Sequence, residues 1–126
     1  MIVAGEASGD LHGSRLLTAM LDRDPSLHFC GIGGPEMKKC GVELLYDASK
    51  IAVVGLFEVI SHLSHLLRAQ LILRERLKSK KPQLLILIDF PDFNLSIAAL
   101  ARKRRVPVLY YVSPQIWAWR PGRVRK

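Results

Sequence analysis

Positions 84–88 carry five consecutive aliphatic residues, and Asp89 follows them directly. A run this short and this uniformly apolar is typical of a strand that is buried on both faces of a sheet. Such strands occur in mostly parallel sheets, in which the connecting helices cover both faces. The run therefore predicts residues 84–88 as a central strand of an α/β fold.

Strand and helix patterns alternate along the rest of the chain. Short apolar runs predict further strands at residues 1–5, 27–32, 42–45 and 106–112. Helical spacing predicts helices at residues 10–21, from Pro35 onward, at residues 57–78 and from Asp92 to about Arg104. This alternation predicts a Rossmann-like, mostly parallel sheet with flanking helices.

Two features of these helices can be specified further. Asp10 and Asp92 stand at predicted helix starts, and because Asp is a preferred N-cap residue we expect both to cap their helices. In the longest helix, apolar side chains recur at helical spacing, which predicts an amphipathic helix with one apolar face. That face carries Leu56, Ile60, Leu63, Leu67 and Leu71.

Parallel sheets bind ligands beyond the carboxyl ends of their strands, where the strand order reverses. Segments 5–10, 89–94 and 113–120 are expected at that edge. In the first segment, two glycines frame a turn that lets a ligand approach the backbone closely, and the alternative is a plain turn before a capped helix. The Asp89 carboxylate can serve as a general base toward a sugar hydroxyl, and the alternative is a hydrogen bond that organises the loop.

Aromatic and basic residues gather near the end of the chain. Both tryptophans, Trp117 and Trp119, lie beside Arg120. Aromatic faces next to an arginine can stack on a sugar or a base or lie at lipid headgroups, and the alternative is packing beneath the loop. The net charge is +8, with 19 Lys+Arg against 11 Asp+Glu. Such a basic balance attracts nucleic acid, anionic lipid or a phosphorylated substrate, and charge alone does not choose among them.

Metal and cofactor sites are not predicted. Cys30 and Cys40 fit neither a disulfide framework nor a zinc pattern. His62 and His65 lie three positions apart on a predicted helix but have no third ligand in view. The absence of a long apolar span and of a secretory signal predicts a cytoplasmic protein.

Five segments together resemble the lipid-A-disaccharide synthase family in order and spacing, and they run along essentially the whole chain. They are residues 4–10 (Ala-Gly-Glu-Ala-Ser-Gly-Asp), 31–37 (Gly-Ile-Gly-Gly-Pro-Glu-Met), 54–59 (Val-Gly-Leu-Phe-Glu-Val), 88–94 (Ile-Asp-Phe-Pro-Asp-Phe-Asn) and 111–120 (Tyr-Val-Ser-Pro-Gln-Ile-Trp-Ala-Trp-Arg). The resemblance implies part of the N-terminal half of a GT-B glycosyltransferase, in which two Rossmann-like halves face a cleft. Family members transfer 2,3-diacylglucosamine from its UDP donor to 2,3-diacylglucosamine 1-phosphate, with inversion and without a metal cofactor. The products are the β-1,6-linked disaccharide 1-phosphate, a lipid A precursor, and UDP.

The resemblance also assigns residues to roles. Asp89 is implied as the general base that deprotonates the acceptor 6-hydroxyl, and Glu6 and Ser8 are implied in the loop that lines the cleft. The other residues that we expect to contact substrate are Gly9, Asn94, Ser113, Trp117 and Arg120. Membrane or acyl-chain contact is expected of Val53, Val54, Leu56 and Phe57, for which the alternative is a place in the core.

Residues 1–126 are expected to form a partial N-terminal, acceptor-side domain that lacks the C-terminal nucleotide-sugar domain, so we expect no activity from this chain alone. The expected partners are the two sugar substrates and the anionic inner-membrane surface, on the cytoplasmic face in a Gram-negative-type bacterium. Homo-oligomerisation is left open. The alternative function is a basic anion- or nucleic-acid-binding α/β module. Nucleic acid is the less favoured partner, because the aromatic residues lie at a strand end and not across a basic sheet face.

Overall fold

The computed structural model describes the backbone of residues 1–51 and 59–112 and the side chains of residues 1–51 and 63–112. Five strands form one sheet in the order β3-β2-β1-β4-β5, and every neighbouring pair is parallel. The strands are β1 (Ile2–Ala4), β2 (Cys30–Gly33), β3 (Glu43–Asp47), β4 (Leu85–Ile88) and β5 (Val108–Val112). The predicted Rossmann-like, parallel sheet is therefore confirmed.

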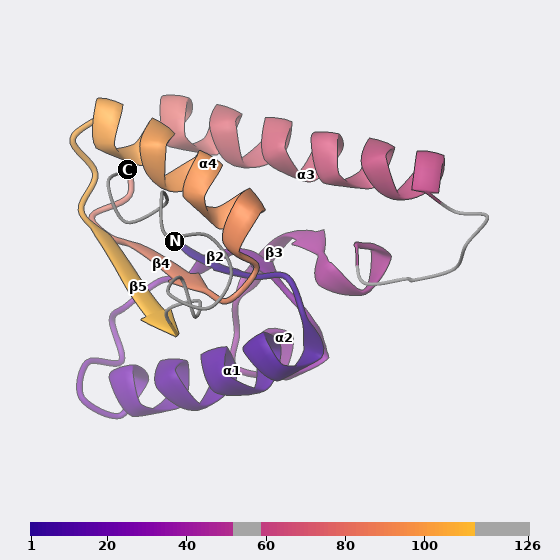
Figure 1. The fold of residues 1–126 in the computed structure, drawn as a ribbon. Coiled ribbons are helices and arrows are strands. Elements are labelled where there is room, and N and C mark those ends of the chain that lie inside the picture. The colour runs from indigo at the N-terminus through magenta and orange to yellow at the C-terminus, as the bar shows by residue number, and fades with distance from the viewer. Residues whose placement is uncertain (52–58, 113–126) are drawn as a thin grey trace.

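Helices cover both faces of this sheet. The α-helices are α1 (Ala7–Leu21), α2 (Pro35–Lys39), α3 (Val59–Ser79) and α4 (Pro91–Lys103), and a short 3-10 helix follows β3 at Ala48–Lys50. Figure 1 shows α1 and α2 on one face of the sheet and α3 and α4 on the other. Within residues 1–51 and 59–112, no helix combines the length and the hydropathy that a membrane span requires.

The strand β4 divides its side chains between two hydrophobic cores. Leu85 and Leu87 belong to the core that includes α3 and α4, whereas Ile86 and Ile88 belong to the core with Leu17 of α1. All four β4 side chains are almost completely buried. This division follows from the period of two along a strand and confirms that residues 84–88 contain a central strand.

The apolar face of α3 differs from the predicted one. Leu63, Leu67 and Leu71 are 56%, 53% and 63% exposed. The buried face is a second stripe, which carries Ala69, Leu73 and Leu77. The helix has two apolar stripes at helical spacing, and periodicity alone does not say which one meets the sheet. Leu56 and Ile60 lie outside the residues whose side chains are described.

Two leucines of α3 allow this assignment to be tested directly. Leu73→Ala is expected to lower the free energy of unfolding by about 2–5 kcal/mol, because it leaves a cavity in the core. The matched change Leu71→Ala is expected to alter it by less than about 0.5 kcal/mol, because that side chain lies in solvent. Urea unfolding followed by circular dichroism measures both changes. Equal losses for the two variants would contradict the orientation of α3.

Candidate functional site

The order of the sheet reverses between β1 and β4, since β2 and β3 lie to one side and β5 to the other. Ala4, the last residue of β1, pairs with Ile88, the last residue of β4. The segments that begin at Gly5 and at Asp89 therefore leave neighbouring strands at the same edge of the sheet. This edge is the expected ligand-binding position in an open parallel sheet. The structure thus brings the segments of Glu6, Ser8 and Asp89 together, as the sequence predicts.

The turn after β4 has an unusual backbone. Asp89 and Phe90 have φ angles of 51° and 47°, which place two successive non-glycine residues in the left-handed region. Each such residue costs about 1–3 kcal/mol and persists only where its surroundings hold it. Asn94 and Tyr110 provide that support. The Asn94 amide Nδ2 donates to the carbonyl oxygen of Asp89 at 2.7 Å, and the Tyr110 hydroxyl donates to the same oxygen at 2.6 Å.

The Asp89 carboxylate accepts no hydrogen bond from any residue in the described part of the chain. The loop is instead organised through the Asp89 main-chain carbonyl. Asp89 is half-buried and lies at the ligand-binding edge. The sequence left two roles open for the Asp89 carboxylate, a general base or a hydrogen bond that organises the loop. The structure gives the second role to the main-chain carbonyl group of Asp89. The carboxyl group remains available for chemistry.

Phe90 joins the two segments of the site. A Cβ atom at Gly5 would lie 2.5 Å from Cδ1 of Phe90, so the aromatic ring rests on the Gly5 backbone. Phe90 also packs on Phe93, with 5.1 Å between ring centroids. Only glycine leaves room for this ring, which explains the first glycine of the Gly5–Asp10 segment without reference to a ligand. Because of this contact, the position of the Glu6 segment and the position of the Asp89 turn depend on each other.

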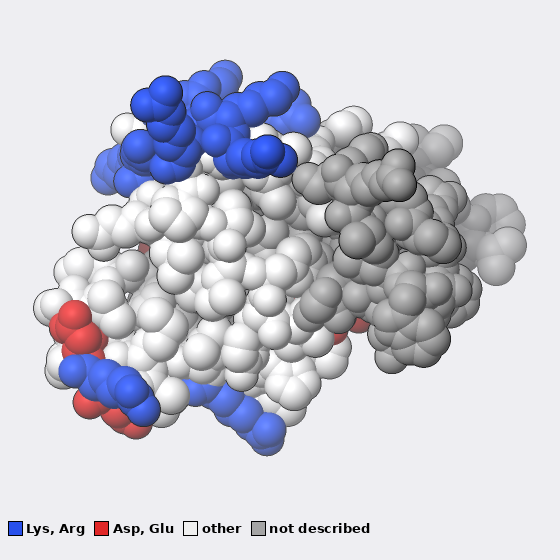
Figure 2. Space-filling model, turned by 60° about the vertical axis from the view of Figure 1, so that its left-hand side comes forward, with Lys and Arg blue, Asp and Glu red and all other residues white. Residues whose placement is uncertain are grey.

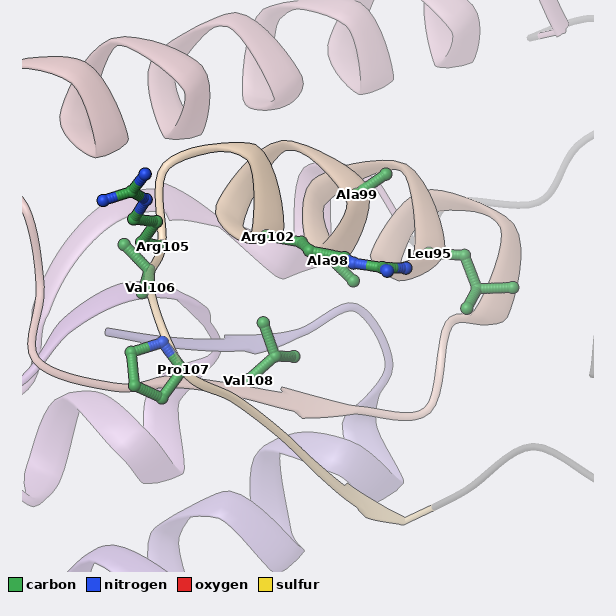
Figure 3. Close-up of a pocket in the computed structure, with 8 residues that line it drawn as sticks. All are labelled: Leu95, Ala98, Ala99, Arg102, Arg105, Val106, Pro107 and Val108. Atoms are coloured by element: carbon green, nitrogen blue, oxygen red, sulfur yellow. The ribbon is translucent and has the colours of Figure 1, made fainter. Parts of the chain in front are cut away.

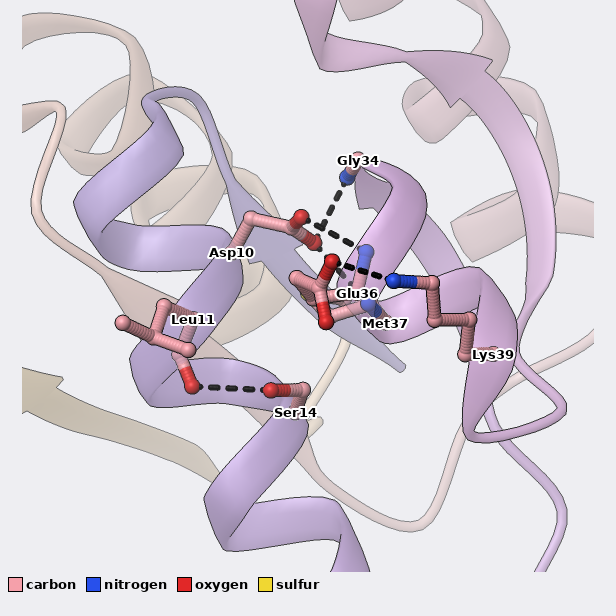
Figure 4. A network of polar contacts seen from close by, with 7 residues as sticks. All are labelled: Asp10, Leu11, Ser14, Gly34, Glu36, Met37 and Lys39. Carbon is pink, nitrogen blue, oxygen red and sulfur yellow. Dashed lines mark hydrogen bonds and ion pairs between the residues drawn. The ribbon is translucent and has the colours of Figure 1, made fainter.

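Asp10 does not cap its own helix, and the N-cap prediction for it is wrong. The helix α1 begins at Ala7, and Asp10 lies inside it, buried to 4% exposure. Its carboxylate accepts backbone N–H groups from Gly34 at 2.8 Å, Glu36 at 2.9 Å and Met37 at 3.0 Å (Figure 4). Asp10 therefore supplies the hydrogen bonds that the first turn of α2 lacks, and it ties α2 to α1 at the ligand-binding edge.

The N-cap prediction for Asp92 is also wrong. The N-cap of α4 is Phe90, Pro91 begins the helix, and Asp92 is an exposed residue of the first turn. Because the left-handed turn ends at Phe90, α4 begins at Pro91. The preference of Asp for N-cap positions had indicated a start after Asp92. At this position the Asp92 carboxylate still has a favourable interaction with the positive end of the helix dipole.

The remaining predicted site residues fall into two groups. Glu6 and Ser8 are exposed, and Gly9 and Asn94 are buried. The Asn94 oxygen Oδ1 has no hydrogen-bond partner in the described part of the chain, and substrate contact by this residue remains a prediction. The other residues lie outside the described residues, namely Val53, Val54, Leu56, Phe57, Ser113, Trp117 and Arg120.

A groove that the sequence analysis missed opens beside the Asp89 turn. It has a volume of about 340 Å³ and lies between α3 and the start of α4. It is lined by Leu63, Leu66, Leu67, Gln70, Phe90, Pro91, Asp92, Phe93 and Ser96. Two of the exposed leucines of α3, Leu63 and Leu67, are among its lining residues. Helical spacing identifies these leucines as an apolar face but does not show that the face lies beside the Asp89 turn and not in the core.

Two other grooves lie away from this edge. One, of about 480 Å³, lies between α4 and the start of β5, and Figure 3 shows Leu95, Arg102 and Val108 among the side chains that line it. The other, of about 380 Å³, lies between the carboxyl ends of α3 and α4 and is lined by Leu77, Lys78, Lys81, Leu100, Lys103 and Arg104.

Figure 2 shows Lys and Arg side chains gathered densely over one end of the molecule. The last turns of α3 and α4 carry Arg76, Lys78, Arg102 and Lys103, and cations at helix carboxyl ends are favoured by the helix dipole.

No three His, Cys, Asp or Glu residues lie close enough to hold a metal ion in the part of the chain that the structure describes. His65 is hydrogen-bonded to the Tyr46 hydroxyl. The side chain of His62 is not among those described. Roles in chemistry for the Asp89 and Glu6 carboxyl groups and the Ser8 hydroxyl group remain predictions.

A family model and the similar curated proteins all point to the same family. The family model described as lipid-A-disaccharide synthetase matches residues 1–126. The chain is 58% identical over 125 residues to a lipid-A-disaccharide synthase of Geobacter sulfurreducens, covering 99% of this chain and 33% of that protein. It is 54% identical to the synthase of Syntrophus aciditrophicus, with the same coverage, and 44% identical to that of Coxiella burnetii, covering 100% of this chain and 34% of that protein. The chain thus spans about a third of the length of these relatives. Because the family model matches every residue, this chain belongs to the lipid-A-disaccharide synthetase family.

Proposed function

We propose that this chain is the acceptor-side part of the N-terminal domain of a lipid-A-disaccharide synthase of the GT-B type. The whole enzyme would transfer 2,3-diacylglucosamine from its UDP donor to 2,3-diacylglucosamine 1-phosphate. The observation that carries the proposal is the half-buried Asp89, whose carboxylate accepts no hydrogen bond from the described residues, on a turn held in the left-handed region next to the Glu6 segment at the ligand-binding edge. Family membership of the whole chain supports the same assignment.

In the proposed reaction, the Asp89 carboxylate accepts the proton of the acceptor 6-hydroxyl as general base. The acceptor oxygen forms a bond to the anomeric carbon of the donor from the face opposite UDP. The bond from that carbon to the UDP oxygen breaks, and its electron pair leaves with the diphosphate. This displacement inverts the anomeric centre and gives the β-1,6-linked disaccharide. We assign the nucleotide site to the two thirds of the relatives' length that this chain does not match, so the chain alone is expected to be inactive.

The outer surface of α3 supports contact with acyl chains and with an anionic membrane. Leu63, Leu67 and Leu71 follow one another at intervals of four residues on the solvent side of the helix. Arg74, Glu75 and Lys78 follow on the same side of the helix, because positions 3, 4 and 7 apart share a helix face, so the stripe passes into charged residues of net positive charge. An apolar stripe that passes into cations is typical of helices that lie at a membrane interface. We therefore place the protein peripherally on the cytoplasmic face of the inner membrane.

The membrane contact can be measured by sedimentation with vesicles of phosphatidylglycerol. Replacing Leu63, Leu67 and Leu71 together by glutamine is expected to remove most of the vesicle-bound fraction, since the apolar area that enters the interface is lost. The matched control is Leu11→Gln on α1, which is 41% exposed on the opposite face of the sheet and should leave binding unchanged. Undiminished binding of the triple variant would show that this face does not contact the membrane.

The proposed activity can be tested in a chimera in which residues 1–126 replace the matching third of the Geobacter sulfurreducens synthase. We expect the chimera to release UDP only when both the donor and the acceptor are present. The unmodified Geobacter protein is the positive control, and the chain alone is the negative control. A folded chimera that binds UDP but transfers no sugar would count against the proposal.

A further inference from the structure

The conformation of the Asp89 turn requires support from outside the turn. Two successive non-glycine residues in the left-handed region are unfavourable by themselves, so the fold has to hold them there. The local contacts within β4 do not do this, because Ile88 is the last residue of the strand. The described contacts that hold the turn come from α4 and from the neighbouring strand β5.

The backbone N–H of Asp89 donates to the Val112 carbonyl oxygen at 3.4 Å, and two side-chain donors converge on a single atom of the turn. The carbonyl oxygen of Asp89 accepts the Asn94 amide at 2.7 Å from α4 and the Tyr110 hydroxyl at 2.6 Å from β5. Asn94 also donates to the carbonyl oxygen of Ile88 at 3.2 Å and is completely buried. Within a residue, the carbonyl group and the Cα–Cβ bond are linked through the ψ angle. Two donors that fix the carbonyl oxygen therefore also fix the direction in which the Asp89 side chain leaves the backbone.

We infer that Tyr110, together with Asn94, is a positioning residue for the Asp89 carboxylate, and this inference rests on the proposed role of Asp89 as general base. Tyr110 lies 21 positions from Asp89 in sequence and acts through the backbone without contact to the reacting atoms. Its hydroxyl selects the backbone geometry that aims the carboxylate toward the acceptor hydroxyl. Loss of this bond changes the rate of proton transfer and leaves the binding of the acceptor intact.

The test is Tyr110→Phe in the chimera with the Geobacter sulfurreducens synthase, which removes one oxygen atom. We expect kcat to fall about 10- to 100-fold, as for a small misplacement of a reacting group, while KM for the acceptor stays unchanged. The matched control is Tyr111→Phe on the same strand, which is 46% exposed and should retain full kcat. Equal kcat values for Tyr110→Phe and Tyr111→Phe would overturn the inference.

A double-variant comparison separates positioning from a merely structural role. If Tyr110 acts only through the Asp89 carboxylate, Tyr110→Phe should cause no further loss in a protein that already carries Asp89→Asn. Multiplying losses would mean that Tyr110 acts on stability or on another group, and they would overturn the inference. An Asp89→Asn variant with full activity would instead refute the proposed role of Asp89 as general base, and a folded chimera that transfers no sugar would refute the proposed function, so these failures are distinguishable.

A spectroscopic measurement on the 126-residue chain does not depend on activity. A strong NOE between the amide proton and the Hα of the same residue reports a positive φ angle at Asp89. We expect it in the unchanged chain and in Tyr111→Phe, and we expect it to weaken in Tyr110→Phe as the turn relaxes. An Asp89 NOE of full strength in Tyr110→Phe would show that the hydroxyl does not hold the turn.

Discussion

Replacing Asp10 with alanine is expected to lower the free energy of unfolding by about 2–6 kcal/mol, because two buried backbone N–H groups lose their acceptor. These groups belong to Gly34 and Met37, and a third N–H, of Glu36, is partly buried. None of the three has a substitute acceptor within the first turn of a helix. The loss is large relative to the stability of a small domain, so the variant is expected to be partly unfolded at 25 °C.

Hydrogen exchange locates this effect. In Asp10→Ala, the amides of Gly34, Glu36 and Met37 are expected to exchange much faster than in the unchanged chain. Asp10→Asn should lie between the two, since one oxygen can still accept the Gly34 and Met37 N–H groups that share Oδ1. The control is Asp24→Ala, which removes an exposed carboxylate that serves only a local turn with Ser26. An unfolding midpoint of Asp10→Ala equal to that of Asp24→Ala would contradict the proposed link between α1 and α2.

The arrangement of the sheet was accessible from the sequence. The run at 84–88 predicts a strand buried on both faces, and the alternation of patterns predicts parallel strands with helical connections. The resulting edge brings Glu6 and Asp89 together, as expected. These features follow from the apolar runs and from the spacing of apolar residues, and both can be read from a single sequence.

The roles of the aspartates were less accessible. Asp10 looked like a helix cap because Asp has a strong local preference for that position. Its actual partners lie 24 to 27 residues further along the chain, and a local preference contains no information about them. The left-handed turn at Asp89 and Phe90 was equally invisible, because its support comes from Tyr110 on another strand. Long-range hydrogen bonds of this kind appear only once the sheet is assembled.

The error on α3 has a different origin. Leu63, Leu67 and Leu71 form a regular stripe, and so do Ala69, Leu73 and Leu77. Both stripes satisfy helical periodicity, so the sequence could not decide between them. The choice follows from packing, since the second stripe meets Leu85 and Leu87 in the core. The other stripe is exposed, and contiguous exposed apolar surface is typical of interaction sites.

Asp89→Asn is expected to reduce the turnover of the chimera by about 10²- to 10⁴-fold, the usual contribution of a positioned general base. The change keeps the size and the shape of the side chain and removes its ability to accept a proton. The Asp89 carboxylate has no hydrogen-bond partner in the described part of the chain, so the substitution should leave stability nearly unchanged. Acceptor binding should also persist, because the loss concerns the transition state.

The most direct test of Asp89 as the general base, the central claim of the proposed mechanism, is therefore the kcat of this chimera with Asp89→Asn, compared with Asp92→Asn. Asp92 lies three positions further on, is exposed in the first turn of α4 and has no role in the proposed proton transfer. The proposal predicts a loss of at least about 10²-fold for Asp89→Asn and nearly full kcat for Asp92→Asn, with a thermal midpoint that is unchanged for Asp89→Asn and slightly lowered for Asp92→Asn, which loses its interaction with the helix dipole. Comparable kcat values for the two folded variants would contradict the assignment of Asp89 as the catalytic base.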